Sequence, residues 1–194
     1  PTRRSSDLEP VLVSEMQLLN NDNFQTLTTT EDDLNAVLWL FEQAISLQGK
    51  NGYKVWEGVD KVTIAKDINE GLQYKIVKDK DILCVFSIQH NDPFIWRDRD
   101  QDDAIYLHRI VVNPEFKGQK QFQKVLDWTI LFARQKNLRY IRMDTWADNE
   151  KIIDYYKSFG FEFIENYTTT NAPELPIQNR NLNVALLEMK LNDK

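Results

Sequence analysis

The residues best suited to bind a charged ligand gather around Gly118, which Lys117 and Lys120 flank. Before them, a run of β-branched and aromatic residues over 104–112 predicts a strand, and after them apolar residues recur at helical spacing as far as Ala133. The turn between strand and helix therefore presents backbone N–H groups that no helix bond satisfies, at the positive end of the helix dipole. A phosphate group can bind at such a turn.

A second group of candidate residues lies downstream, between Asn149 and Gly160. The alternating stretch 139–145 predicts a strand, and the residues at 147–150 that follow it are typical of a helix start. Gly160 comes just after the expected helix, where a left-handed residue commonly ends one. The chain thus has a second strand–turn–helix unit, and Tyr156 lies on its helix.

Together these two blocks resemble the GNAT superfamily of N-acyltransferases. Residues 117–122, KGQKQF, fall on the family's acetyl-CoA pyrophosphate loop, R/Q-x-x-G-x-G/A, and residues 149–161, NEKIIDYYKSFGF, resemble its N-x-x-A-x-x-x-Y-x-x-x-G-F block. The first block departs from the family, because Lys120 and Phe122 stand where it usually has glycine or a small residue that lets the backbone approach a pyrophosphate. Two interpretations of Phe122 stay open: its ring crowds the cofactor, or it points into the helix–sheet interface and leaves the amides free.

The resemblance extends from about residue 24 to residue 191. It implies an α+β fold, a mixed sheet flanked by helices, in which the strands at 104–112 and 139–145 splay apart to admit the cofactor. It also implies an N-acetyltransferase that moves an acetyl group from acetyl-CoA to a primary amine of a small molecule or a protein by direct attack.

The same resemblance implies roles for individual residues. Main-chain groups at the end of the first strand would pair with the pantetheine arm, and the loop amides would hold the pyrophosphate. Asn149 would contact the pantetheine, and Tyr156 would protonate the departing thiolate as general acid. The other interpretation of Tyr156 is a core aromatic that packs with Ile152 and Phe159. The expected cofactor-binding residues are Ile110, Val111, Val112, Lys117, Gly118, Gln119, Lys120, Gln121, Phe122, Asn149 and Tyr156.

Neither block identifies the general base. His108 is one candidate, because an unperturbed histidine pKa of about 6.5 suits proton removal near neutral pH. Strand alternation places it on the same face as Ile110. Two alternatives stay open, a histidine held by a structural hydrogen bond and a water relay to a carboxylate such as Glu162 or Asp144. Because no cluster of His, Asp and Cys has ligand spacing in the sequence, we expect no metal.

The remaining elements must position these residues. The pattern predicts further strands over 24–28, 72–77, 82–89, 161–164 and 182–191, and helices from Leu34 to about Gly49 and over 59–69. In the second of these helices Val62, Ala65 and Ile68 are expected to face inward. Tyr53 and Trp56, between the two helices, either line the acceptor site or pack in the core.

The charged segment 90–103 predicts a solvated surface loop. The other interpretation makes Phe94, Ile95 and Trp96 a lid over the acceptor. Cys84, in the hairpin before this segment, is expected to be a small buried hydrophobe, because nothing near it predicts the exposed, electropositive setting of a reactive thiol.

Length and composition indicate one globular domain. The 194 residues are 42% hydrophobic and 28% charged, which is enough apolar material for a core. We expect a tail over 1–22 and the domain over 23–194. Residues 1–8, PTRRSSDL, resemble the in-frame translation of a common sequencing-adapter oligonucleotide, so we expect them to lie outside the fold. The alternative is a disordered polar N-terminus.

Composition also bounds the partners. A formal charge of −6 argues against nucleic acid, and no apolar run approaches the roughly 18 residues of a membrane span. The single Cys84 fits a reducing cytoplasm. We therefore expect a cytoplasmic monomer or homodimer that acts on an amine. Two other function classes stay open: a catalytically idle CoA-binding or regulatory module, and a binder of a different nucleotide or phosphate.

Overall fold

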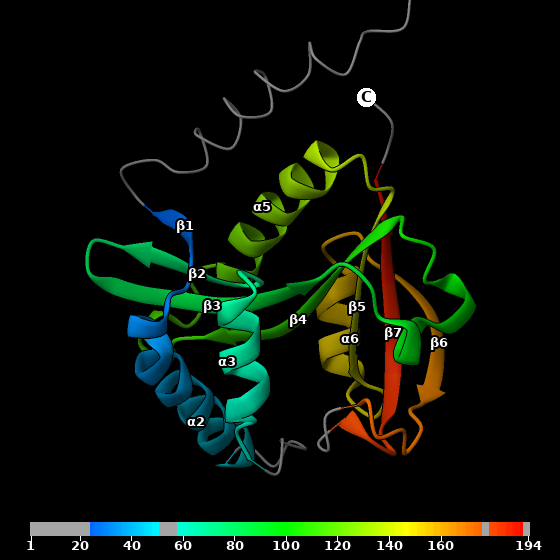
Figure 1. Cartoon of the computed structure of the whole chain (residues 1–194), viewed down its shortest axis with the longest axis horizontal. Coiled ribbons are helices and arrows are strands. Elements are labelled where there is room, and N and C mark those ends of the chain that lie inside the picture. Colours follow the sequence, from blue (N-terminus) through cyan, green and yellow to red (C-terminus); the bar gives the residue numbers. More distant parts are fainter. Residues whose placement is uncertain (1–23, 51–57, 176–178, 192–194) are drawn as a thin grey trace, which may run out of the picture.

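The computed structural model describes residues 24–50, 58–175 and 179–191, so the expectations for Tyr53 and Trp56 lie outside it. Within these ranges seven strands form one sheet in the order β1-β2-β3-β4-β5-β7-β6 (Figure 1). The strands are β1 (Gln25–Thr28), β2 (Gln73–Lys78), β3 (Asp81–Gln89), β4 (Ala104–Val112), β5 (Tyr140–Trp146), β6 (Glu162–Thr168) and β7 (Asn183–Lys190). Neighbours pair antiparallel except β4 and β5, which run parallel. The sheet is therefore mixed, as predicted.

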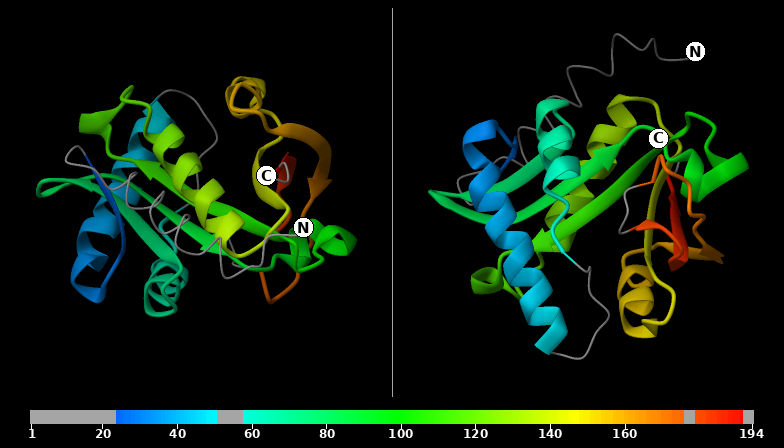
Figure 2. Two further views of the ribbon diagram at one scale, coloured as in Figure 1. Left: turned by 90° about the horizontal axis from the view of Figure 1, so that it is seen from above. Right: turned by 60° about the horizontal axis from the view of Figure 1, so that its bottom comes forward.

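Helices cover both faces of this sheet (Figure 2). On one face lie α5 (Gln121–Gln135) and α6 (Glu150–Lys157). On the other lie α2 (Leu34–Lys50) and α3 (Lys61–Asn69), which confirms the α+β class. The shorter elements are η2 (Glu31–Asp33), α4 (Pro93–Trp96), η3 (Arg97–Arg99) and η4 (Pro114–Phe116). Over the described ranges, no helix has both the length and the apolar character that a membrane crossing requires.

Strand β3 explains why both faces are covered. Cys84, Phe86 and Ile88 pack in the core cluster under α5, whereas Val85 packs in the cluster with α2 and α3. Because successive side chains of a strand point to opposite faces, an unbroken apolar run needs cover on both. Cys84 is fully buried, as predicted, and burial raises the pKa of its thiol to about 12.

Helix α5 is the helix that the apolar spacing predicts. Its buried face includes Phe122, Val125, Leu126, Thr129 and Ala133, all predicted to be apolar contacts of the helix. The helix contacts β3, β4 and β5, the central strands of the sheet. Its position therefore brings the loop before it close to the place where β4 and β5 meet.

The predicted inward face of α3 is partly wrong. Ile68 is buried as predicted, but Val62 is 81% exposed, and the helix buries Ile64, one turn before Ile68. The buried stripe follows the i, i+4 spacing of these two isoleucines, which Val62 does not share. The helix starts at Lys61, where the Asp60 side chain accepts a hydrogen bond from the Thr63 N–H and caps the first turn.

The segment 90–103 is mostly exposed, as predicted for a surface loop, but part of it is helical and two of its apolar residues are buried. The alternative that it forms a lid stays a prediction. The segment folds into α4 and η3, and Ile95 and Trp96 are buried in a cluster with Tyr106. Some of its polar groups have partners within the protein: the Tyr106 hydroxyl donates to Asp100 Oδ1 over 2.6 Å, and Arg142 donates to the Arg99 carbonyl. Other charged residues of the segment, such as Asp98 and Asp102, are exposed.

Candidate active site

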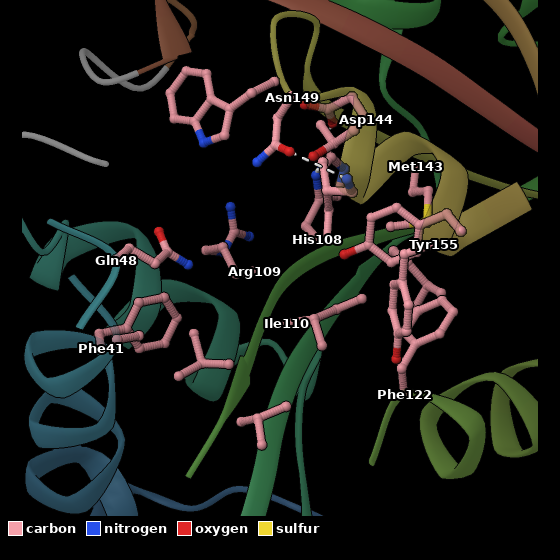
Figure 3. Close-up of a pocket in the computed structure, with 18 of the residues that line it drawn as sticks. Phe41, Gln48, His108, Arg109, Ile110, Phe122, Met143, Asp144, Asn149 and Tyr155 are labelled. Carbon is pink, nitrogen blue, oxygen red and sulfur yellow. Dashed lines mark hydrogen bonds and ion pairs between the residues drawn. The ribbon is translucent and has the colours of Figure 1, made fainter. Parts of the chain in front are cut away.

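A cleft opens where β4 and β5 part. Their parallel pairing runs from Ala104 opposite Tyr140 to Leu107 opposite Met143 and stops there, although both strands continue. Beyond this last pair lies a cavity of about 800 Å³ with walls from β4, β5, α2, α5 and α6 (Figure 3). The splayed central strands are thereby confirmed. Every expected cofactor-binding residue lines this cavity except Gln119, which is exposed.

Arg109 interrupts the regular alternation of β4. Its φ of 51° is left-handed, and here the pairing with β3 slips, so that Arg109 and Ile110 together stand opposite Phe86. This is a β-bulge, which inserts one residue and reverses the side-chain directions after it. Ile110 consequently packs on the α5 face, as Leu107 does before the bulge, and Val111 packs on the face of α2 and α3.

The prediction that His108 shares a face with Ile110 is wrong for this reason. His108 precedes the bulge and points to the face opposite the cluster under α5. Figure 3 shows it beside Asp144, with Phe41 and Gln48 of α2 across the cleft. His108 therefore points toward the side of the cleft that α2 closes, whereas the bulge turns Ile110 to the α5 face.

The loop before α5 has the backbone shape that an anion needs. Gly118 has a φ of 81° and Lys120 a φ of 54°, so Lys120 adopts the left-handed conformation that glycine takes most easily. Within the described part of the chain, the amides of Gly118 to Gln123 donate no backbone hydrogen bond, and no side chain caps α5. These N–H groups are therefore free to bind an anion at the helix N-terminus.

The ring of Phe122 packs between α5 and α6. It is 4% exposed, and its centroid lies 4.9 Å from those of Tyr156 and Phe159, both in edge-to-face contact. Of the two interpretations that the sequence leaves open, the structure matches the second: the ring joins the helix interface, and the amides before it stay free.

Helix α6 brings Asn149 and Tyr156 to the same cleft. Asn149 is its N-cap, and Oδ1 accepts a hydrogen bond from the Ile152 N–H over 3.2 Å, which leaves the side-chain NH₂ group to donate elsewhere. Tyr156 packs against the core cluster under α5 and also lines the cleft, so the two interpretations of its role are compatible. Burial is the main cause that raises the pKa of its hydroxyl, which therefore stays protonated at neutral pH.

His108 lies between two carboxylates. Its Nε2 is 3.3 Å from Asp92 Oδ2, and its Nδ1 is 3.7 Å from Asp144 Oδ1. Burial favours the neutral imidazole, but Asp92 and then Asp144 outweigh it and raise the pKa of His108. Burial also raises the pKa of Asp144. A cluster of two carboxyl groups and one imidazole favours a cationic amine in the cleft.

The fold thus assembles a cluster that linear spacing does not reveal. Within the described ranges, Asp92, His108 and Asp144 form the one set of three whose ligand atoms all lie within 4.8 Å of one another. The prediction of no metal used spacing along the sequence, which does not reveal this cluster. Each ring nitrogen of His108 faces a different carboxylate. This arrangement suits proton transfer, and the absence of a metal stays a prediction.

Several site residues have no signal in the sequence. Arg109 lines the cleft and is paired with Asp67 of α3, which holds that helix against the bulge. Asp92 reaches His108 from the turn before α4. Glu162, an alternative relay to the base, is exposed and does not line the cleft.

Both the sequence and the fold of this chain resemble those of known acetyltransferases. Residues 72–161 match the sequence model described as the acetyltransferase (GNAT) family. The uncharacterized N-acetyltransferase YesJ of Bacillus subtilis is 25% identical over 151 residues, which cover 74% of this chain and 84% of YesJ. A GNAT-family acetyltransferase of Listeria monocytogenes shares the fold with a TM-score of 0.72, at 20% identity over 87% of this chain and 95% of the other. The structure of yncA from Salmonella typhimurium with its cofactor acetyl-CoA has a TM-score of 0.60, at 15% identity over 89% and 96% of the two chains.

Proposed function

We propose that this chain is an acetyltransferase of the GNAT family, as the match over residues 72–161 and its relatives support, and that it moves the acetyl group of acetyl-CoA directly to a primary amine. The observation that supports this most strongly is the coincidence of two features in one cleft. Unpaired amides from Gly118 to Gln123 lie at one end, and the parted strands β4 and β5 lie at the other. A diphosphate joined to an extended thiol arm has the charge and shape for that combination.

The cofactor would bind as an added strand. The edge of β4 over 108–112 has no partner from β5, so its backbone groups can pair with the two amides of the pantetheine arm. The pyrophosphate would accept hydrogen bonds from the loop amides, and the NH₂ group of Asn149 would donate to the arm. The thioester carbon would then lie near Ile110, between the two sides of the cleft.

The chemistry divides between these two sides. On the side of Asp144, His108 would accept a proton from the ammonium of the acceptor, and the free amine would attack the thioester carbon. A C–N bond forms and the C–S bond breaks. On the α6 side, the Tyr156 hydroxyl would donate its proton to the departing thiolate of CoA. The new amide nitrogen would lose its second proton to solvent, and Tyr156 would regain a proton from solvent. Proton acceptor and proton donor thus stand on opposite sides of the reacting carbon.

A panel of amines tests this proposal. The full chain is incubated with acetyl-CoA and, in turn, with alkylamines, arylalkylamines, polyamines, amino acids and peptides, and release of free thiol is followed. Turnover that depends on one of these amines supports the proposal. Binding of acetyl-CoA by calorimetry without amine-dependent thiol release from any acceptor would instead support the idle CoA-binding module, an alternative favoured by the unusual Lys120 and Phe122.

The exposed charges at the loop supply a smaller part of cofactor binding. We expect Lys117→Ala to weaken acetyl-CoA binding about two- to fivefold at low salt, because an exposed charge pair contributes little, and the loss should shrink as salt screens it. Calorimetry at two salt concentrations measures this. Lys136→Ala, at the opposite end of α5, is the matched control and should leave the Kd unchanged. Equal affinities for Lys117→Ala and the parent protein at low salt would mean that the amides hold the pyrophosphate alone.

A further inference from the structure

Asp92 is an aspartate at a helix N-cap that does not cap the helix. It precedes Pro93 at the start of α4, yet its side chain accepts no hydrogen bond from the first turn. Instead its Oδ2 is enclosed and lies 3.3 Å from His108 Nε2, an ion-pair contact, and among the described residues it accepts no hydrogen bond of ordinary geometry. A buried carboxylate is costly unless a charge or a hydrogen bond compensates it, and His108 is the partner in place.

The turn that carries Asp92 is held from two directions. Its backbone N–H donates to Asp100 Oδ2 over 3.1 Å, and the α4 residues Ile95 and Trp96 that follow are buried in the core. The carboxylate therefore has a fixed position. Asp92 does not line the cleft, whereas His108 and Asp144 do. Asp92 can therefore influence the reaction only through its contact with His108.

We propose that Asp92 is a positioning residue, which holds the His108 ring with one nitrogen turned to the cleft side of Asp144 so that this nitrogen can take the proton of the acceptor amine. A negative charge this close to Nε2 favours the proton on Nε2 and leaves Nδ1 as the proton-accepting nitrogen. Asp92 thereby selects the tautomer in which the lone pair faces the acceptor. The role in turnover rests on the proposed function, but the tautomer and the ionisation of His108 do not.

The other charges around His108 leave Asp92 as the dominant partner. Asp144 faces Nδ1 from β5 at the longer distance of 3.7 Å. Arg109, the next residue of β4, opposes protonation, but its charge is paired with Asp67 of α3. Removal of the Asp92 charge should therefore lower the pKa of His108, because the carboxylate that stabilises the imidazolium most is lost.

Nitrogen NMR of the histidine rings tests this without any ligand. The chain has two histidines, so His90→Asn identifies the signals of His108. In the parent protein, His108 should titrate above the ordinary histidine range and, when neutral, carry its proton on Nε2. Asp92→Asn should lower its pKa and populate the other tautomer, and Asp92→Glu should restore both in part. Asp98→Asn, which removes the same charge from exposed η3, should change neither.

Kinetics supply the second readout. With the best acceptor of the amine panel, Asp92→Asn should lower the plateau kcat about tenfold, a part of what a general base contributes, and leave the KM for acetyl-CoA unchanged. Its rate should begin to rise at a lower pH, because His108 becomes neutral sooner. A neutral His108 protonated on Nδ1 in the parent protein, or a titration and tautomer that Asp92→Asn does not alter, would overturn the proposal even if activity falls. Absence of turnover in the parent protein would refute the proposed function and leave the NMR result to decide this one.

Discussion

Replacement of Tyr156 by phenylalanine should lower kcat about 100-fold and leave the KM for acetyl-CoA nearly unchanged. The expected loss is the usual contribution of a general acid, and the ring that packs against Phe122 is retained. Because burial raises the pKa of the hydroxyl, the group is protonated across the neutral range and is available as a proton donor. Initial rates at saturating amine, with acetyl-CoA varied, separate kcat from KM.

Tyr155→Phe is the matched control for this substitution. Tyr155 precedes Tyr156 on α6 and also lines the cleft, but it is 42% exposed. We expect its kcat to fall by less than about threefold, well short of what loss of a general acid causes. A loss at Tyr155 that equals or exceeds the loss at Tyr156 would transfer the acid role to Tyr155 and contradict the alignment of Asn149 and Tyr156 with the family block.

Phe122→Ala should destabilise the protein by about 3–5 kcal/mol, the usual cost of truncating a buried phenylalanine. The side chain is 4% exposed and joins α5 to α6 through Tyr156 and Phe159. The substitution should not tighten acetyl-CoA binding, because the ring fills the helix interface and does not cover the loop amides. Denaturant unfolding measures the stability, and calorimetry below the unfolding midpoint measures the affinity.

Two further variants test whether the loss of stability is specific to the buried ring of Phe122. Phe132→Ala, on the same helix but only partly buried, should destabilise less. Phe122→Leu, which keeps most of the volume, should lose a fraction of the stability and bind acetyl-CoA as the parent does. If Phe122→Ala gained affinity and lost little stability, the ring would be an obstacle in the cofactor path, which is the interpretation that the present geometry argues against.

Much of the fold can be predicted from local patterns. The spacing of Val125, Leu126 and Thr129 is enough to predict α5, and the apolar run at 82–88 is enough to predict a strand covered on both faces. The loop before α5 can be placed because its glycine and the helix start are adjacent in the chain. In each case residues near in sequence determine the structure, so the sequence carries the information directly.

The acceptor side of the site could not be predicted in the same way. Arginine is not a residue type that predicts a β-bulge, so the sequence does not reveal the bulge at Arg109. Without the bulge, the His108 side chain is assigned to the wrong face of β4. Asp92 and Asp144 come from distant parts of the chain and meet His108 only after the sheet forms. Trp96 is buried although its neighbours are charged, because its ring packs with Tyr106 in the core while the charged residues beside it stay exposed. All three features depend on contacts between segments that are distant in the sequence.

The central claim is that the free amides before α5 and the gap between β4 and β5 bind two different parts of one cofactor. Backbone amide NMR shifts with two probes, CoA and pantetheine, test it most directly. CoA should shift the amides of 118–123 together with those of 108–112, whereas pantetheine, which lacks the diphosphate, should shift 108–112 and leave 118–123 in place. Saturating CoA that shifts neither group, or CoA shifts confined to another surface, would contradict the account.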